Sequence, residues 1–349
     1  MLLYNTMPRK VEGNPQTTLS RREFLKLSAG YFGLKVLKIC LTYSGLEALA
    51  FAGMLLESER LRINHHIYRD PNFPKEWDGA IVVHISDLHI GQEGVHAVYP
   101  EYIRLLSIKI NEYLKYINAD PNKTFLFDTG DSVIVKKDHT PSRIEDFTEA
   151  FGYLLDVVAG VKVAVEGNHD KAHPDRKEIE EMYVNAGYVY GGDPDQSWTT
   201  PRIIDDPRFP FAICVAPDFT TRSESWYKSK EANLFLEALE NFSPHRMLIL
   251  LTHNPSMIDL WKGGKIQQVL AKKKFIILAG HTHGGQLNSL SPAQSLIMKI
   301  GMEIKNYNSQ FINGVYKFNK SMVMINSGLG ESGGPRTEPR SVDVIEFRR

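Results

Sequence analysis

Short apolar runs that end in polar clusters are the dominant pattern along this chain. Five mainly apolar runs, each four or five residues long, are followed within two or three positions by Asp, Asn or His; they cover residues 81–85, 124–127, 161–165, 247–251 and 275–279. Runs of this length and character are typical of buried β-strands. Because open α/β sheets carry their functional groups at the carboxyl ends of strands, we expect the polar clusters to meet at one edge.

Stretches with apolar residues at helical spacing lie between these runs. They predict helices over residues 102–117, 144–158, 177–186 and 231–242, and further strand runs cover residues 211–215, 322–326 and 342–346. Such an alternation of helices and strands predicts an α/β fold. Residues 191–207 and 284–312 lack a regular pattern, and we expect them to form connectors.

The composition indicates one large globular domain. The chain has 349 residues, of which 42% are hydrophobic and 23% charged, so it can bury a sizeable core. Its formal net charge of +0 gives no reason to expect a nucleic-acid partner. With only Cys40 and Cys214, the chain has no disulfide framework and no Cys-based zinc site, and we expect Cys214 to be a buried strand thiol.

The polar clusters contain the side chains that bind divalent metal ions. His281 and His283 stand two positions apart just past a strand run, so both can point to one place. Carboxylate and imidazole groups suit Mn²⁺, Fe²⁺ or Zn²⁺. Two such ions about 3.5–4 Å apart can share one carboxylate and activate a water molecule for attack on phosphorus. The clusters therefore predict phosphoester hydrolysis.

The order of the clusters resembles the calcineurin-like metallophosphoesterase superfamily. Asp-x-His at 87–89 is followed by Gly-Asp at 130–131, Gly-Asn-His-Asp at 167–170, a strand-end histidine at 253 and Gly-His-x-His at 280–283. The resemblance covers residues 79–347. It implies an α/β fold of calcineurin-like type, a four-layer α/β/β/α sandwich with two mixed β-sheets.

The resemblance also implies a role for each residue of these motifs. Asp87, His89 and His283 would hold one metal ion, Asp131 would bridge to a second, and Asn168, His253 and His281 would complete the second site. His169 would lie near the scissile phosphate and stabilise charge or protonate the leaving oxygen, with Asp170 orienting its imidazole. The implied cofactors are two divalent metal ions, Mn²⁺ in the first place and Fe²⁺ or Zn²⁺ otherwise.

Other residues give weaker indications. Arg336 is a candidate substrate-binding residue and Arg340 a second one, because guanidinium suits phosphate; both could equally belong to a solvated tail. The apolar-rich run 296–304 is either a core-packed helix or a lid that accepts acyl chains. We expect His84 to be a core residue, and we expect the remaining histidines to be solvated: His65, His66, His96, His139, His173 and His245.

The N-terminal segment carries a targeting signal. Residues 20–26 match the twin-arginine export consensus, and an apolar stretch follows that ends in A-x-A-like sites at 48–50 and 50–52. Lys35, Lys38 and Glu47 interrupt that stretch, so an uncleaved amphipathic helix in the membrane interface is the alternative. We therefore divide the chain into a signal or interfacial segment, 1–55, and a catalytic domain, 56–349. Export predicts a membrane-associated, periplasmic enzyme, and retention places it on the cytoplasmic face of the inner membrane.

These features predict a dinuclear-metal hydrolase of phosphodiester or pyrophosphate bonds in a lipid-linked or cell-envelope substrate. The N-terminus and the extended motif at 280–286 together resemble the membrane-associated bacterial phosphodiesterase branch, which is related to the UDP-2,3-diacylglucosamine pyrophosphatase of lipid A synthesis. That pyrophosphatase activity is one alternative, and a non-catalytic scaffold on the same fold is another. Phosphoprotein is a poor substrate candidate, because Glu166 stands where protein Ser/Thr phosphatases carry Arg.

Overall fold

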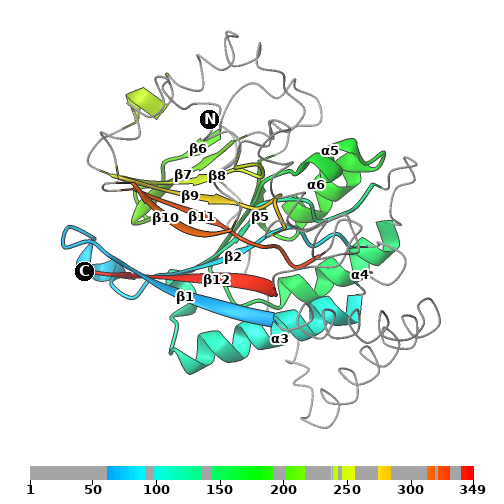
Figure 1. Cartoon of the computed structure of the whole chain (residues 1–349), viewed down its shortest axis with the longest axis horizontal. Coiled ribbons are helices and arrows are strands. Elements are labelled where there is room, and N and C mark those ends of the chain that lie inside the picture. The colour runs from blue at the N-terminus through cyan, green and yellow to red at the C-terminus, as the bar shows by residue number, and fades with distance from the viewer. Residues whose placement is uncertain are drawn as a thin grey trace, which may run out of the picture.

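Two six-stranded β-sheets form the centre of the molecule (Figure 1). The structure is a computed structural model, and it describes residues 61–90, 98, 100–135, 144–191, 202–216, 237, 239–242, 246–255, 274–283, 313–318, 321–330 and 339–349. The strand order is β1-β12-β2-β3-β4-β5 in the first sheet and β10-β11-β9-β8-β7-β6 in the second. Each sheet is therefore built from residues far apart in the sequence.

Both sheets are mixed. The first contains β1 (Leu61–Arg69), β2 (Ile81–Ile85), β3 (Thr124–Asp128), β4 (Val161–Ala164), β5 (Tyr188–Tyr190) and β12 (Arg340–Arg348). Neighbours from β2 to β5 are parallel, whereas β12 runs antiparallel to β2 and parallel to β1. The second contains β6 (Arg202–Ile204), β7 (Phe211–Val215), β8 (Met247–Leu251), β9 (Phe275–Ala279), β10 (Gly314–Phe318) and β11 (Ser321–Ile325). Its edge strands β6 and β10 are antiparallel to their neighbours, and the four central strands are parallel.

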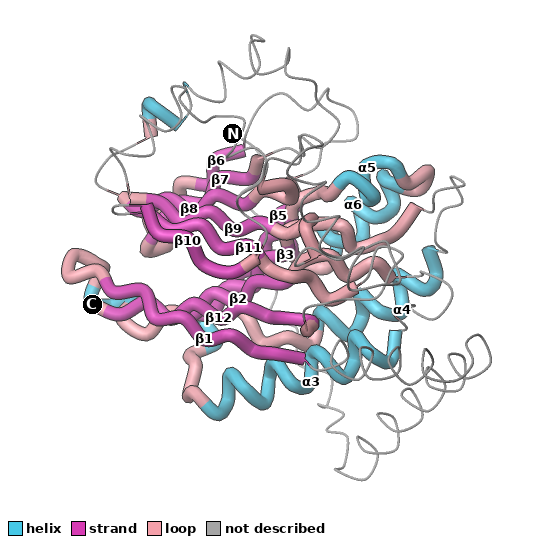
Figure 2. The backbone as a smooth tube through the Cα atoms, viewed as in Figure 1, coloured by secondary structure: helices cyan, strands magenta, loops and turns pink. Residues whose placement is uncertain are grey.

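Three apolar clusters hold the layers together. The cluster between the sheets joins alternate residues of both, with the Phe125 and Phe211 rings 4.8 Å apart. On the outer side of the first sheet, a second cluster packs it against α3 (Pro100–Tyr116), α4 (Ile144–Leu155) and α6 (Arg176–Asn185). On the outer side of the second sheet, Leu239 and Phe242 pack against β7, β8 and β9. Figure 2 shows the stacked sheets with α3 along the outside of the first. The predicted four-layer α/β/β/α sandwich is thus confirmed.

The alternation of apolar and polar residues predicted most of these elements. All five strand runs became strands of the two sheets, and three of the four predicted helices correspond to α3, α4 and α6. The fourth, 231–242, lies mostly outside the described residues. The edge strands β1 and β10 and the three-residue edge strand β5 were not predicted, and β6 lies within the expected connector 191–207. Edge strands face water on one side, so they keep polar residues and lack a continuous apolar run. The connector 284–312 and the segment 1–55 lie outside the described residues.

The predictions for the histidines and the cysteine outside the metal motifs are only partly confirmed. His84 and Cys214 are both fully buried, as expected. The expectation that His173 is solvated is wrong, because its exposed fraction is 3% and its Nδ1 accepts a hydrogen bond from the Asp175 amide. His65 is exposed, as expected, and pairs with Glu346 at 3.0 Å, whereas His66 is half-buried and lies 3.4 Å from Asp343. His96, His139 and His245 lie outside the described residues. Among the described residues, no helix combines the length and the apolar character needed to cross a membrane.

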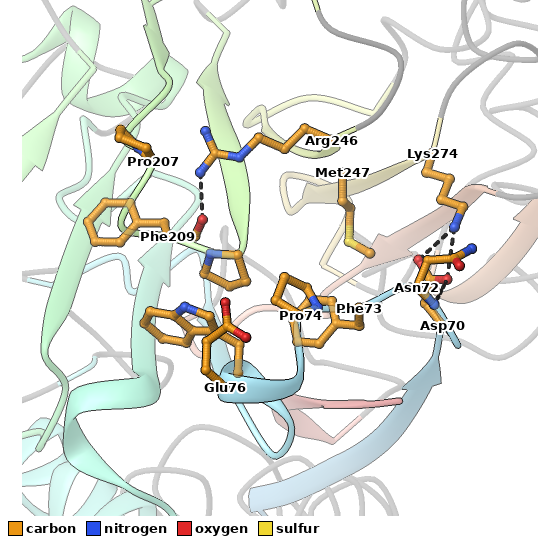
Figure 3. A pocket seen from close by; sticks show the side chains of 12 residues that line it. Asp70, Asn72, Phe73, Pro74, Glu76, Pro207, Phe209, Arg246, Met247 and Lys274 are labelled. Atoms are coloured by element: carbon orange, nitrogen blue, oxygen red, sulfur yellow. Dashed lines mark hydrogen bonds and ion pairs between the residues drawn. The ribbon is translucent and has the colours of Figure 1, made fainter.

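A cavity of about 540 Å³ lies near the amino ends of β2, β8 and β9, between the loop after β1 and the loop before β7 (Figure 3). Its two cations are already paired: Lys274 binds both oxygens of Asp70, and Arg246 binds Asp205 and backbone carbonyls. These ion pairs join the two loops to the starts of β8 and β9. The cavity is at the opposite end of the strands from the predicted metal ligands.

Candidate metal centre

The predicted ligands meet where five parallel strands end. Asp87 and His89 follow β2, Asp131 follows β3, Asn168 and His169 begin α5 (Asn168–Ala172) after β4, His253 follows β8, and His281 and His283 follow β9. Most of them are buried: the exposed fraction is 0% for Asp87, His89 and His253 and 5% for His283. Asn168, His169 and His281 are half-buried.

The first group consists of Asp87, His89 and His283, whose candidate ligand atoms lie close enough together to hold one ion. Nε2 of His89 and Nε2 of His283 are 3.1 Å apart. Oδ1 of Asp87 lies 3.4 Å from the His283 nitrogen and 3.8 Å from the His89 nitrogen. That oxygen is buried and accepts no hydrogen bond. The three atoms therefore converge on one point.

The second group consists of Asp131, His253 and His281. Nε2 of His253 is 3.1 Å from Oδ2 of Asp131 and 3.1 Å from Nδ1 of His281. The side-chain oxygen of Asn168 is also 3.1 Å from the same nitrogen. The amide oxygen thus joins two imidazoles and a carboxylate around a second point.

Asp131 lies between the two groups. Its Oδ2 is 3.1 Å from the His253 nitrogen in the second group and 3.7 Å from the His89 nitrogen in the first. Its Oδ1 accepts a hydrogen bond of 2.8 Å from the His169 amide. His89, Asp131 and His169 also form a third set of converging atoms. This carboxylate is therefore the side chain that the two groups share.

The hydrogen bonds of His253 show that these atoms suit a cation. Its Nδ1 lies 2.8 Å from the carbonyl oxygen of Thr129, and since a carbonyl can only accept, Nδ1 carries the proton. In the neutral ring Nε2 then presents a lone pair to the oxygens of Asp131 and Asn168, which are acceptors too. A bound cation satisfies all of them at once, whereas a single proton serves one contact. Donation from the second ring nitrogen to a carbonyl is also the usual support of a metal-binding histidine.

Both carboxylates of the centre are held in the ionised form. Burial alone would raise the pKa of Asp87, but the surrounding imidazoles, His283 first, hold that pKa well below its ordinary value. For Asp131, burial would also raise the pKa, but the surrounding imidazoles, His253 first, together have the larger effect and lower it. Burial lowers the pKa of His169 in spite of the nearby Asp131, so its imidazole is neutral at neutral pH. Ionised carboxylates and neutral imidazoles are the protonation states that bind divalent metal ions.

The backbone at the centre is strained. Among the described residues, all non-glycine residues with positive φ except Asn118 belong to the two groups: Asp87 (52°), His89 (47°), Asp131 (57°), His281 (69°) and His283 (48°). Such φ values are uncommon for residues with a Cβ, and they concentrate at functional sites. The neighbouring glycines allow the close approach this requires. A Cβ on Gly167 would lie 2.1 Å from Oδ1 of Asp131, and one on Gly280 would lie 1.8 Å from Oγ of Ser86.

Asp170 differs from its expected role. Its Oδ2 accepts hydrogen bonds from the amides of Asp131 and Gly167, at 2.8 and 2.9 Å, and its Oδ1 accepts from the amides that follow Asp131, those of Ser132 and Val133, at 2.9 and 3.1 Å. The carboxylate therefore binds the two metal-binding loops to each other, and the expectation that it orients the His169 ring does not fit these contacts. That ring is positioned instead by the Val135 amide, which donates to Nδ1 at 3.1 Å.

Asp128 is a supporting residue that the sequence motifs did not reveal. Its Oδ1 accepts from the Gly130 amide at 3.0 Å, and its Oδ2 accepts from Tyr183 at 2.8 Å and from Ser132 at 3.2 Å. These bonds hold the turn on both sides of Asp131. The signal available was an aspartate at the end of a strand, directly before Thr-Gly-Asp.

Asp128 provides a pH-dependent contribution to stability. Burial, opposed by the Gly130 amide and the Tyr183 hydroxyl, raises its pKa from 3.8 to about 7. Between about pH 4 and 7, the folded state therefore keeps a proton on Asp128 that the unfolded state has released. The stabilisation of the fold that results from this difference is complete below about pH 4 and is lost as the pH rises through about 7. In Asp128→Asn this dependence should vanish. We expect the free energy of unfolding of the wild type, relative to the variant, to fall by about 4 kcal/mol between pH 4 and 8. Urea unfolding of both proteins across that range measures it, and a constant difference would contradict it.

The two predicted phosphate-binding arginines have different outcomes. Arg336 lies outside the described residues. Arg340 is fully buried on β12, with its guanidinium 4.5 Å from the centre of the Tyr102 ring and its Nη1 donating to the Leu329 carbonyl at 2.5 Å. Both expectations for Arg340, a phosphate contact and a solvated tail, are therefore wrong. The Tyr102 ring, which belongs to the apolar cluster on the first sheet, lies against the guanidinium.

Comparison with known proteins identifies the fold family. A family model described as calcineurin-like phosphoesterase matches residues 81–285, which is more than half of the chain. No curated protein matches the chain. Among solved structures, the chain is similar to the phosphopantetheinyl hydrolase of Mycobacterium tuberculosis, with 13% identity and a TM-score of 0.36 over 72% of this chain and 91% of that one.

Proposed function

The chain belongs to the calcineurin-like phosphoesterase family, and from this premise we propose that it hydrolyses phosphodiester or pyrophosphate bonds with two divalent metal ions. The observation that carries the proposal is the position of Asp131, whose carboxylate is shared by two groups of converging nitrogen and oxygen atoms. A shared carboxylate is the usual feature of two-metal phosphoesterases.

Each group supplies ligands to one ion in this proposal. Asp87, His89 and His283 would hold one, Asn168, His253 and His281 the other, and Asp131 would contact both. When bound, the ions supply Lewis acidity toward the phosphoryl oxygens and a water molecule of lowered pKa. Nitrogen and oxygen donors without thiolate favour Mn²⁺, with Fe²⁺ or Zn²⁺ as alternatives.

We assign proton donation to His169. Since its Nδ1 accepts the Val135 amide, the neutral ring carries its proton on Nε2. The ring lies beside the first group, with its centroid 5.0 Å from that of His89. A proton at this position can bind a phosphoryl oxygen or pass to the leaving oxygen.

Replacement of His169 by alanine tests this assignment. We expect kcat to fall by about 10²- to 10⁴-fold for substrates with a poor leaving group and much less for p-nitrophenolate, which needs no proton. The Mn²⁺ content should stay unchanged. Activity is measured on aryl phosphodiesters of increasing leaving-group pKa.

The matched control is His173→Gln, which changes a buried histidine four positions later that lies outside both groups. It should leave kcat within a few-fold of wild type. An equal loss for good and poor leaving groups in His169→Ala would argue against proton donation.

For the substrate, we propose a lipid-linked or cell-envelope phosphodiester or pyrophosphate, with the enzyme at a membrane surface. The support is the twin-arginine consensus at 20–26 and the apolar run 296–304 beside the metal motifs, both outside the described residues. Hydrolysis of UDP-2,3-diacylglucosamine is the alternative if the N-terminal segment stays on the cytoplasmic side. N-terminal sequencing of the protein from the membrane fraction separates them: a start near residues 51–53 supports export, and an intact residue 1 opposes it.

A non-catalytic scaffold is the second alternative. It predicts that metal ligands have been lost, and all seven candidate ligand side chains are present in this chain. Elemental analysis of the purified protein, together with turnover of bis-p-nitrophenyl phosphate in Mn²⁺, decides between them. Absence of both a bound metal and turnover would favour the scaffold.

A further inference from the structure

A buried polar network lies between the two sheets directly beneath the metal centre. Whereas the interface between the sheets is otherwise apolar, at this end it contains Asp343 of β12, His84 of β2 and Asn326 after β11. Asp343 and His84 are cross-strand neighbours, and their exposed fractions are 5% and 0%. Asp343 and Asn326 lie beyond residues 81–285, the part of the chain that matches the family model.

One arm of this network leads to the second group. Nδ1 of His84 lies 3.8 Å from Oδ2 of Asp343, and Nε2 of the same ring lies 2.9 Å from the hydroxyl of Thr129. The carbonyl of Thr129 in turn accepts the proton on Nδ1 of His253, at 2.8 Å. Burial outweighs the attraction of Asp343 and lowers the pKa of His84 to about 4, so the ring is a neutral polar link at neutral pH. Neighbouring polar groups thus lead from Asp343 through His84 and Thr129 to His253; the first step, 3.8 Å long, is a close approach and not a hydrogen bond.

The other arm leads to the first group. Oδ2 of Asp343 accepts a hydrogen bond of 2.8 Å from Asn326, whose own oxygen accepts from the Gly328 amide at 2.7 Å. These bonds shape the loop 326–330, and the Gly330 amide donates to the carbonyl of Asp87 at 2.5 Å. A Cβ on Gly328 would lie 2.8 Å from the Cβ of Asp87, so this loop packs closely on that ligand.

The carboxylate itself is fixed from the opposite side. Its Oδ1 accepts from Asn64 at 2.9 Å and lies 3.4 Å from Nε2 of His66, both on β1. Although burial alone would raise the pKa of Asp343, its partners outweigh it and lower the pKa, so the group is ionised. A single buried charge thus has contacts that lead to both groups.

We propose that Asp343 is a positioning residue for the metal centre, acting on His253 through His84 and Thr129 and on Asp87 through Asn326 and the loop 326–330. This inference rests on the proposed function. Outer contacts of this kind set the orientation of metal ligands, and their removal typically weakens metal affinity about 10- to 100-fold.

The test compares Asp343→Asn with Glu346→Gln in the full-length chain. Both changes remove a carboxylate from β12, but Glu346 contacts His65 and Arg348, away from the centre. For Asp343→Asn we expect Mn²⁺ affinity, measured by isothermal titration calorimetry, to fall about tenfold or more. Hydrolysis of bis-p-nitrophenyl phosphate should be lost at limiting Mn²⁺ and largely restored by excess Mn²⁺, with KM unchanged. Glu346→Gln should match the wild type in both measurements.

A second variant distinguishes the loss of ligand positioning from a general folding defect. His84→Leu places an apolar side chain of similar size where a neutral ring is buried, and it breaks only the arm to His253. It should also weaken Mn²⁺ binding.

The outcomes distinguish this inference from the proposed function. A wild-type protein that binds no Mn²⁺ would overturn both. Wild-type Mn²⁺ binding together with unchanged affinity in His84→Leu and in any folded Asp343→Asn protein would overturn the positioning role alone, even if the melting temperatures fall.

Discussion

Asp131→Ala should abolish hydrolysis of bis-p-nitrophenyl phosphate in Mn²⁺, with a loss of about 10³-fold or more in kcat/KM. The carboxylate lies between the two groups, and it is the shared side chain, so its removal deprives both metal positions of one ligand. Stabilisation of the phosphoryl group by the two ions is lost together with their arrangement, and single changes in such a unit cost nearly as much as several. Steady-state kinetics over a range of Mn²⁺ concentrations measures the loss.

Asp175→Ala is the matched control, since its carboxylate is 48% exposed and lies outside both groups. Its kcat/KM should stay within a few-fold of wild type. Retention of near-wild-type activity by Asp131→Ala would contradict the two-metal proposal, whatever the metal content. Elemental analysis of the same samples shows whether the loss follows the metal.

Asp170→Asn should destabilise the protein by about 3–5 kcal/mol. Both oxygens of Asp170 are buried and together accept four backbone amides from the loops of Asp131 and Gly167. Asparagine keeps the shape, but its NH₂ group faces two N–H donors, which lose their acceptor. A buried donor without an acceptor costs about 1–3 kcal/mol, and two such donors account for the expected loss.

The measurement is urea unfolding of the metal-free protein at pH 8. Burial and the nearby Asp131 raise the pKa of Asp170 to about 6, so at pH 8 its carboxylate is ionised. Asp175→Asn, which removes an exposed carboxylate, should change the free energy of unfolding by less than about 0.5 kcal/mol. A loss below about 1 kcal/mol in Asp170→Asn would show that the two loops are held by other contacts.

The motifs predicted the ligands for a physical reason that is visible in the structure. Each ligand directly follows a short apolar strand, and parallel neighbouring strands end at the same edge of a sheet. Asp87 and Asp131 follow adjacent strands of the first sheet, whereas His253 and His283 follow adjacent strands of the second. Local patterns therefore placed the candidate ligands at the ends of strands, and the family resemblance implied how they are grouped.

The supporting residues were not predictable in the same way. Asp170 was singled out by its motif for a different role, that of orienting the His169 ring. Its partners are backbone amides, and residue identity does not reveal such partners. Asp343 lies inside a strand with apolar neighbours, and nothing local distinguishes it from an ordinary polar strand residue. Arg340 resembled an exposed cation until its packing against Tyr102 was known.

Some features of this protein thus follow from the sequence alone, and others are decided only by the tertiary structure. The strand and helix pattern, the fold class and the identity of the candidate ligands follow from residue order, because they depend on periodicity and on neighbours a few positions apart. The sharing of Asp131, the bonds of Asp170 and the network around Asp343 depend mostly on contacts between residues far apart in the sequence, for example 37 positions for Val133 and Asp170 and 279 positions for Asn64 and Asp343. Those contacts form when the strands assemble into sheets and the two sheets pack together, so their partners depend on sheet order, register and inter-sheet packing, which local residue patterns do not encode.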